Sequence, residues 1–370
     1  MESSPEFSAF GPSATSAFKI QPAHRTCGNF MSIKTVEQLD DVLSQPPEWL
    51  VESLAPLKGD ILVLGVAGKM GPTLARMAKR ASEQAGVDRR VIGVARFSNP
   101  AERQKLESWG IETVKADLLD EKSVAGLPDA PNMVFMAGMK FGSTGSEALT
   151  WAMNAVVPAL VAARYRNSRI AVFSTGNVYG LVPVSGGGSI ESDSLNPTGE
   201  YAMSCLGRER VFEHFSRANG TPMSIIRLNY ACELRYGVLV DLATRIINRQ
   251  PIDVTMGAFN VIWQGDANAH ALASLVDVDT PPFVVNVTGP ETLCVRSVSE
   301  QLAKRMNLPV EFVGEESSTA LLNDARFSHN RYGPPTVSLS QMLDSVADWV
   351  TSGGESLGKP TGFEVRDGKF

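Results

Sequence analysis

The chain has 370 residues, 43% of them hydrophobic, which is enough for one large α/β domain or two fused domains with a sizeable core. Its 34 lysines and arginines stand against 40 aspartates and glutamates, and the resulting charge of −6 argues against a nucleic-acid-binding surface. No apolar run approaches the roughly 20 residues of a membrane-spanning helix, so we expect no membrane partner.

Cysteines and histidines are few and scattered, without the spacing of metal ligands. They are Cys27, Cys205, Cys232, Cys294, His24, His214, His270 and His329. We therefore expect no metal site. Unclustered cysteines are typical of a reduced, intracellular protein, which favours a cytoplasmic location.

Residues 1–30 are rich in Ser, Pro, Ala and Gly, which predicts a disordered tail, or a segment ahead of a second start at Met31. Residues 31–57 are predicted to form two short helices that cover a sheet edge or an oligomer surface. Apolar side chains recur there at helical spacing over residues 36–43 and again over 49–57.

A glycine-rich turn follows the first predicted strand, the apolar run at residues 61–64. Gly65, Gly68 and Gly71 are spaced three residues apart, and Lys69 and Met70 lie between the last two. A helical pattern begins at Gly71. Strand, glycine turn and helix form the arrangement that binds a dinucleotide diphosphate at a helix N-terminus. Taken alone, the glycines also fit an ordinary strand-to-helix turn.

The second predicted strand, residues 91–95, ends at Arg96. In a dinucleotide-binding sheet this position faces the adenosine ribose. A guanidinium there suits a 2′-phosphate, so Arg96 slightly favours NADP over NAD. The alternative is an ordinary surface arginine.

The next strands also end in residues suited to a cofactor. A strand at residues 110–118 ends in Asp117 and Leu118, and Asp117 either accepts a hydrogen bond from the adenine amino group or caps the helix beginning near Asp120. A strand at residues 133–138 ends in small residues, including Ala137, that let a cofactor approach. A fifth strand is predicted at residues 169–173.

Five strands alternating with helices predict an α/β fold with a doubly wound parallel sheet and right-handed crossovers. We expect this domain to span residues 58–235. A smaller C-terminal substrate lobe, interleaved with it, would span 236–352. Residues 353–370 are rich in Gly and charge, which predicts a mobile tail.

Several motifs together resemble the extended short-chain dehydrogenase/reductase family, specifically its NAD-dependent epimerase/dehydratase group. The resemblance runs from Asp60 to Trp349. The matching segments are the glycine turn, Asp117-Leu118, Asn154, Ser174-Thr175, Val178-Tyr179-Gly180, Tyr201, Arg227 and residues 285–290. It implies a Rossmann-type fold, an NAD or NADP cofactor and a small-molecule substrate. It also suggests a homodimer.

The resemblance implies a catalytic set of Ser or Thr, Tyr and Lys. Thr175 matches the hydroxyl that holds the substrate oxygen, and Tyr201 matches the general acid/base. Cys205 stands where the family has its lysine, four residues after the tyrosine. Lys140, just past the fourth strand, is a candidate substitute. Cys205 itself is either a packing residue or a reactive thiol.

The missing lysine affects the two reaction directions differently. An unassisted tyrosine has a pKa near 10, so about one molecule in a thousand is ionised at pH 7. As a base, such a tyrosine is deficient by about 4 kcal/mol. As an acid it needs no ionisation, so carbonyl reduction suffers less than alcohol oxidation.

The sequence therefore predicts an NAD(P)-dependent epimerase/dehydratase-like oxidoreductase that acts on a sugar, sugar nucleotide or related polyhydroxy compound. Arg235 is a candidate for binding a substrate phosphate, although a surface ion pair explains it equally well, and Arg326 is a second candidate for a phosphate. The alternative is a non-catalytic dinucleotide-binding protein with a sensing or assembly role.

Overall fold

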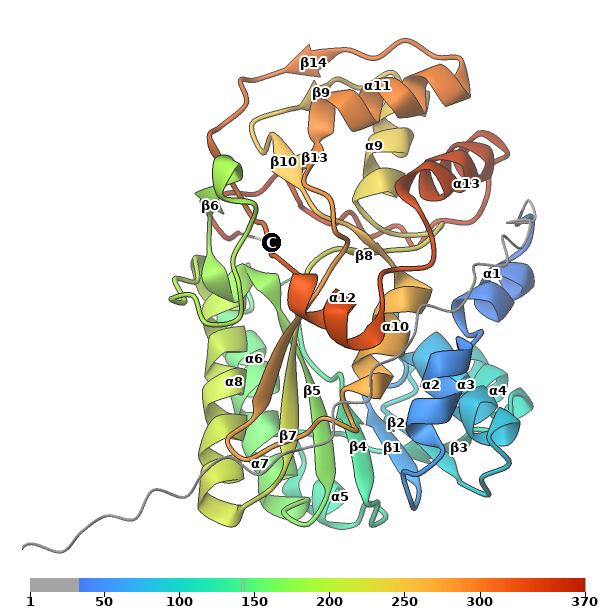
Figure 1. Ribbon diagram of the computed structural model, residues 1–370, viewed down its shortest axis with the longest axis vertical. Helices are drawn as coiled ribbons and strands as arrows, with labels where there is room; N and C mark the ends of the chain where they lie inside the picture. The colour runs from blue at the N-terminus through green and yellow to red at the C-terminus, as the bar shows by residue number, and fades with distance from the viewer. Residues whose placement is uncertain (1–32, 141, 143, 370) are drawn as a thin grey trace, which may run out of the picture.

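The computed structural model describes residues 33–140, 142 and 144–369. The tail expected over residues 1–30, and the alternative start at Met31, lie outside the described residues. Figure 1 shows a parallel sheet with helices on both faces and a smaller lobe above the carboxyl ends of its strands.

The central sheet has the strand order β12-β7-β5-β4-β1-β2-β3, and every adjacent pair is parallel. This order confirms the predicted doubly wound fold, because the chain runs outward from β1 first in one direction and then in the other. The strands are β1 (Ile61–Leu64), β2 (Val91–Ala95), β3 (Glu112–Lys115), β4 (Asn132–Phe135), β5 (Arg169–Thr175), β7 (Met223–Leu228) and β12 (Phe283–Val287).

Both faces of the sheet are buried at β1 and β2, which explains why these strands read as continuous apolar runs, whereas the edge strand β3 is partly exposed. Ile61 and Val63 of β1 pack toward α2 (Glu48–Leu54), α3 (Gly71–Gln84) and α10 (Gln264–Ala273). Leu62 and Leu64 pack toward the opposite layer. That layer contains α5 (Glu121–Ala125), α6 (Glu147–Trp151), α7 (Val157–Arg164) and α8 (Gly199–Asn219).

The helix predicted after the fourth strand contains a π-helical segment, Ala152–Val156, between α6 and α7. A π-turn inserts one extra residue and frequently occurs at functional sites. Here it buries Asn154, which contacts the loop after β4. The remaining helices of this half are α1 (Val36–Leu43) and α4 (Pro100–Ser108), with 3-10 turns at Gly176–Tyr179 and Val184–Gly186.

The C-terminal lobe has its own apolar core, built on three amphipathic helices. These are α9 (Val238–Ile247), α11 (Val295–Met306) and α13 (Leu339–Thr351), accompanied by the short α12 (Arg326–Tyr332). Its small strands are β6 (Val182–Pro183), β8 (Ala231–Cys232), β9 (Ile252–Asp253), β10 (Ala258–Phe259), β11 (Ile262–Trp263), β13 (Leu293–Cys294), β14 (Phe312–Val313) and β15 (Thr319–Ala320). Across the described part of the chain, no helix is both long and apolar enough to cross a bilayer.

Residues 353–369, expected from composition to be mobile, instead pack against the lobe. Phe363 is 2% exposed and belongs to the lobe core, with its ring 6.1 Å from that of Phe259. Arg366 donates a hydrogen bond to the carbonyl of Thr319 at 2.7 Å. A single buried aromatic residue gives no periodic signal, so the Gly-rich composition concealed this anchoring.

Candidate active site

The glycine turn after β1 is shaped by close backbone contacts. Gly65 has a φ of +87°, and a Cβ atom there would lie 2.7 Å from the nitrogen of Ala137. A Cβ on Gly71 would lie 2.3 Å from the carbonyl oxygen of Val66. By contrast, a Cβ on Gly68 would approach only the Gly65 oxygen, at 3.3 Å. Gly65 and Gly71 therefore allow the backbone to pack closely, while Gly68 leaves open space beside the turn.

The helix that follows this turn has an N-terminus suited to an anion. Met70 is the N-cap of α3 and provides no side-chain cap, and Pro72 occupies the first turn. Uncapped N–H groups and the positive end of the helix dipole together favour negative charge. The turn, the open space at Gly68 and this helix end fit a dinucleotide diphosphate.

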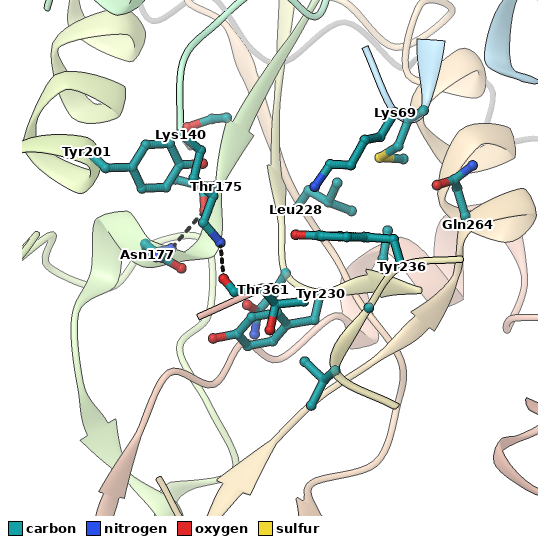
Figure 2. A pocket seen from close by; sticks show the side chains of 16 residues that line it. Lys69, Lys140, Thr175, Asn177, Tyr201, Leu228, Tyr230, Tyr236, Gln264 and Thr361 are labelled. Carbon is teal, nitrogen blue, oxygen red and sulfur yellow. Dashed lines mark hydrogen bonds between the residues drawn. The ribbon is translucent and has the colours of Figure 1, made fainter. Parts of the chain in front are cut away.

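A cavity of about 140 Å³ lies between the carboxyl ends of the strands and the lobe. Figure 2 shows side chains from both sides pointing into it. Its polar and aromatic lining residues are Lys69, Lys140, Ser174, Thr175, Asn177, Tyr201, Asn229, Tyr230, Tyr236, Gln264 and Thr361. Among the described residues, no three His, Cys, Asp or Glu side chains are grouped as metal ligands would be.

The structure brings Thr175 and Tyr201 together in this cavity. Thr175 ends β5, its hydroxyl accepts a hydrogen bond from the Asn177 N–H at 3.2 Å, and it also hydrogen-bonds Tyr201 in the first turn of α8. Burial raises the pKa of Tyr201 well above its usual value, and Cys205 adds to this rise, while Arg208 and the Thr175 hydrogen bond oppose it. Tyr201 is therefore protonated at neutral pH.

Cys205 lies on the same helix but does not line the cavity. It is completely buried and packs in a small cluster with Val178 and Tyr179. Burial raises the pKa of its thiol. A buried, protonated thiol fits the packing interpretation rather than a reactive one.

Lys140 reaches the cavity from the loop after β4. Its ammonium lies 5.8 Å from the centre of the Tyr201 ring and donates a hydrogen bond to the Thr361 carbonyl at 3.0 Å. Burial lowers the pKa of Lys140 to about 8, opposed by Asp241 and Cys205. The structure thus places a lysine beside the tyrosine, although on a different element from that of the family lysine.

A backbone clamp fixes the chain just before Lys140. The Asn154 side chain accepts from the Met139 N–H at 2.9 Å and donates to the Met139 carbonyl at 3.0 Å. It also accepts from Arg208 at 2.5 Å. A Cβ on Gly138 would lie 2.3 Å from the Arg208 guanidinium and 2.9 Å from the Asn154 Oδ1, so a larger residue there would displace this hydrogen-bonded pair. The π-turn that presents Asn154 thereby helps to position Lys140.

Lys69 also contributes its side chain to the cavity, whereas the sequence indicated only its backbone. Its ammonium lies 3.1 Å from the centre of the Tyr236 ring. Burial lowers the pKa of Lys69 to about 6, and Lys140 and Lys359 lower it further, while Asp241 opposes them. Two lysines therefore share one cavity.

A buried ion pair holds the end of β5 against α8 and β7. Arg227 and Glu209 are 2.8 Å apart and nearly inaccessible to solvent. The Ser174 hydroxyl donates to Glu209 at 2.5 Å, and Arg227 donates to the Tyr179 hydroxyl at 2.9 Å. These contacts fix Thr175, the neighbour of Ser174, relative to the helix that carries the catalytic tyrosine candidate.

Three predicted cofactor residues lie away from the cavity, toward the β2 and β3 edge. Arg96 is exposed at the carboxyl end of β2. Asp117 is exposed and accepts from the Leu119 N–H at 3.0 Å, while Leu118 is buried. The alternative that Asp117 caps the following helix is wrong, because Asp120 provides that cap.

Neither predicted phosphate-binding arginine lines the cavity. Arg235 is buried in ion pairs with Asp40 and Glu233, at 3.3 and 3.1 Å. Arg326 is 82% exposed and pairs with Asp324, two residues earlier. Arg235 therefore links α1 to the lobe through its ion pairs, and Arg326 forms an ion pair on the surface.

Sequence reasoning did not identify several lining residues. Tyr230 and Tyr236 lie in loops that the family resemblance marks as facing substrate, and this was the available signal for them. Gln264 begins α10 and donates to Thr73 of α3 at 3.2 Å. Thr361 comes from the tail, where no pattern indicates a site.

Comparison with solved structures shows that this fold is shared. The chain is similar to Pal from Bacillus thuringiensis (TM-score 0.66, 16% identity, covering 79% of this chain and 99% of that one). It is also similar to UDP-glucuronic acid 4-epimerase from Bacillus cereus in complex with NAD (TM-score 0.64, 18% identity, covering 79% of this chain and 97% of that one). A third similar structure is dTDP-glucose 4,6-dehydratase from Bacillus anthracis in complex with NAD (TM-score 0.66, 15% identity, covering 80% of this chain and 97% of that one).

No curated protein matches the sequence. Residues 61–235, from β1 to the loop after β8, match the model of the NAD dependent epimerase/dehydratase family. This region contains the glycine turn, Thr175, Tyr201 and the Glu209–Arg227 pair. The match thus assigns this region, and not the whole chain, to the NAD dependent epimerase/dehydratase family.

Proposed function

We propose that the protein is an NAD(P)-dependent oxidoreductase of the epimerase/dehydratase type that acts on a sugar or related polyhydroxy compound. The observation that carries the proposal is one cavity lined by Lys69 and Met70 of the glycine turn and by Thr175, Tyr201 and Lys140. A diphosphate-binding turn and a proton donor at the same cavity are what hydride transfer to a carbonyl carbon needs.

The residues available for the cofactor follow from this arrangement. The backbone of Gly68 to Gly71 would hold the diphosphate, and Gly65 and Ala137 would let the dinucleotide approach the sheet. Asp117 and Leu118 would border the adenine, and Arg96 would favour a 2′-phosphate. Bound NAD(P) would supply the hydride donor or acceptor.

Tyr201 is best suited to act as a general acid. Because its pKa is raised, it carries its proton and can donate it to a substrate carbonyl oxygen that Thr175 also holds. As a base it would first have to ionise in a buried site. The site therefore supports carbonyl reduction more strongly than alcohol oxidation.

Lys140 takes over part of the role of the missing family lysine in this proposal. Its ammonium, on the cavity side of Tyr201, would stabilise the tyrosinate that remains after proton donation. Its hydrogen bond to Thr361 and the clamp at Met139 hold it in place.

The competing function is a non-catalytic dinucleotide-binding protein, which the burial of Cys205 at the family lysine position favours. The test is to identify any co-purifying dinucleotide by mass spectrometry and then follow reduced-cofactor absorbance with carbonyl and alcohol forms of sugars. Turnover that Tyr201→Phe lowers by about 10²- to 10⁴-fold supports the enzyme. Bound cofactor without turnover on any compound supports the competing function.

A further inference from the structure

Arg208 is a buried arginine on α8, the helix that also carries Tyr201, and it is 6% exposed. Its guanidinium donates hydrogen bonds to the carbonyl of Phe173 in β5 at 2.8 Å and to the side-chain oxygen of Asn154 at 2.5 Å. Gly138 leaves room for this group, because a Cβ there would lie 2.3 Å from it. The end of β5, the π-turn and the loop after β4 therefore hold the guanidinium in one place.

Both acceptors of these hydrogen bonds are uncharged, and in the described part of the chain no carboxylate forms an ion pair with Arg208. The carboxylate next to it in sequence, that of Glu209, pairs with Arg227 at 2.8 Å, so those two charges largely balance each other. A guanidinium stays charged at every pH at which proteins remain folded. Arg208 therefore adds a positive charge to this part of the interior that does not depend on pH.

The spacing along α8 places Arg208 on the same face of the helix as Tyr201 and Cys205. Arg208 follows Cys205 by three residues and Tyr201 by seven, which correspond to about one and two helical turns. Burial raises the pKa values of the Tyr201 hydroxyl and the Cys205 thiol, and the Arg208 charge acts in the opposite direction on both. Position and charge thus connect Arg208 with the proton donor of the site.

Proton donation by Tyr201 leaves a tyrosinate, whose negative charge is costly in a buried site unless a cation stabilises it. We propose that Arg208 is a positioning residue that acts through Tyr201: its fixed guanidinium stabilises this tyrosinate and supplies part of the charge that the family lysine would supply at position 205. The inference rests on the proposed oxidoreductase function and adds a residue to that site. Lys140 and Arg208 then share the role, one from the cavity wall and the other from within α8.

Coulomb's law gives the expected size of the effect. Two helical turns span about 10 Å along the helix axis. At that distance, a unit charge acting through an effective dielectric constant of about 20 shifts an ionisation equilibrium about tenfold, or about one pKa unit. Removal of the Arg208 charge should therefore raise the pKa of Tyr201 further by about one unit and lower kcat for carbonyl reduction by up to about tenfold.

Titration of a fluorinated tyrosine measures this effect without turnover. Difluorotyrosine incorporated at position 201 ionises at lower pH than tyrosine, and fluorine NMR reports this residue alone. We expect Arg208→Gln and Arg208→Met, which remove the charge with side chains of different shape, each to raise its pKa by about one unit. Arg208→Lys should leave the pKa nearly unchanged, because the charge remains.

Arg210→Gln is the matched control for this titration. It removes an arginine from the same helix, but the Arg210 side chain is 61% exposed and pairs with Glu213 at 2.8 Å. Because solvent screens an exposed charge, this variant should leave the pKa of the fluorinated tyrosine unchanged.

Steady-state kinetics of the variants without fluorotyrosine give the second readout. Arg208→Gln and Arg208→Met should lower kcat while changing the KM for the cofactor little, and Arg208→Lys should keep most of the activity. An equal pKa of the fluorinated tyrosine with and without the Arg208 charge overturns the inference and leaves Arg208 a structural role. If the pKa rises as expected but the wild type turns over no compound, the proposed oxidoreductase function fails while the effect of Arg208 on Tyr201 stands.

Discussion

The Lys140 ammonium donates a hydrogen bond to the backbone carbonyl of Thr361 at 3.0 Å, although 221 positions separate the two residues. Thr361 is in turn tied to Asp241 in the first turn of α9. The C-terminal segment is therefore part of the candidate active site, and the lysine that we assign to catalysis depends on it.

Phe363→Ala tests the role of this segment. Loss of a buried phenylalanine should lower the free energy of unfolding by about 3 kcal/mol. It should also raise KM, because Thr361 would no longer be held beside Lys140. Phe327→Ala, which removes a ring that is 47% exposed, should change both much less. Denaturant unfolding measures the free energy of unfolding, and steady-state kinetics measure KM. An unchanged KM in Phe363→Ala would show that the C-terminal segment does not contribute to the active site.

An exchange of lysine positions tests whether Lys140 replaces the family lysine. Lys140→Met should lower kcat strongly, because the positive charge beside Tyr201 is lost. Cys205→Lys alone should also lower activity and stability, since a second ammonium enters a buried site. The double variant should be more active than Lys140→Met alone, because one lysine again stands beside the tyrosine. If Cys205→Lys raises activity while Lys140 is present, Lys140 does not fill this role.

The pH dependence of carbonyl reduction follows from the two pKa shifts. Lys140, with a pKa of about 8, loses its charge as the pH rises through that value, whereas Tyr201 keeps its proton. We therefore expect kcat/KM for reduction to fall above about pH 8. In Lys140→Arg this fall should disappear, because a guanidinium stays charged. If kcat/KM falls above about pH 8 in both the wild type and Lys140→Arg, a group other than Lys140 causes the fall.

The sheet was predictable from sequence for a physical reason. Strands covered on both faces are apolar throughout, so β1 and β2 appear in the sequence at the bounds that the structure gives. The glycine turn was predictable because Gly65 must adopt a positive φ and approach Ala137 closely. Local constraints of this kind leave a signature in the sequence.

Contacts between distant segments leave no such signature. Arg235 suits a phosphate when read alone, yet Asp40, 195 positions away, pairs with it in a buried site. Thr361 becomes a cavity residue only because Phe363 is anchored in the lobe. The Lys69 ammonium lies over the Tyr236 ring, which no local pattern places there.

A buried histidine should make stability depend on pH. His270 lies among the rings of Trp49, His329 and Tyr332, and burial lowers its pKa to about 3. An unfolded histidine titrates near 6.5, so between about pH 6.5 and 3 the unfolded chain binds a proton that the folded chain does not. Stability should therefore fall as the pH falls through this range, by up to about 1.4 kcal/mol per pH unit.

His270→Gln isolates this contribution, because glutamine does not titrate. The loss of unfolding free energy between pH 7 and pH 5 should be smaller in the variant than in the wild type by about 2 kcal/mol. Urea unfolding at the two pH values measures it. An identical loss in both proteins would assign the pH dependence to other groups.

The central claim is that the turn after β1 binds the diphosphate of a nicotinamide dinucleotide, and calorimetry with Gly68→Ala tests it most directly. Gly68 has no positive φ, and an added Cβ would meet only the Gly65 oxygen, so the variant should fold normally. The methyl group would occupy the space left for the diphosphate. Gly186→Ala, in a loop with no atom within 4 Å of the added Cβ, is the control. We expect the wild type and Gly186→Ala to bind NAD(H) or NADP(H) and Gly68→Ala to bind about tenfold or more weakly. Absence of binding to either dinucleotide by the wild type, or equal binding by Gly68→Ala, would contradict the account.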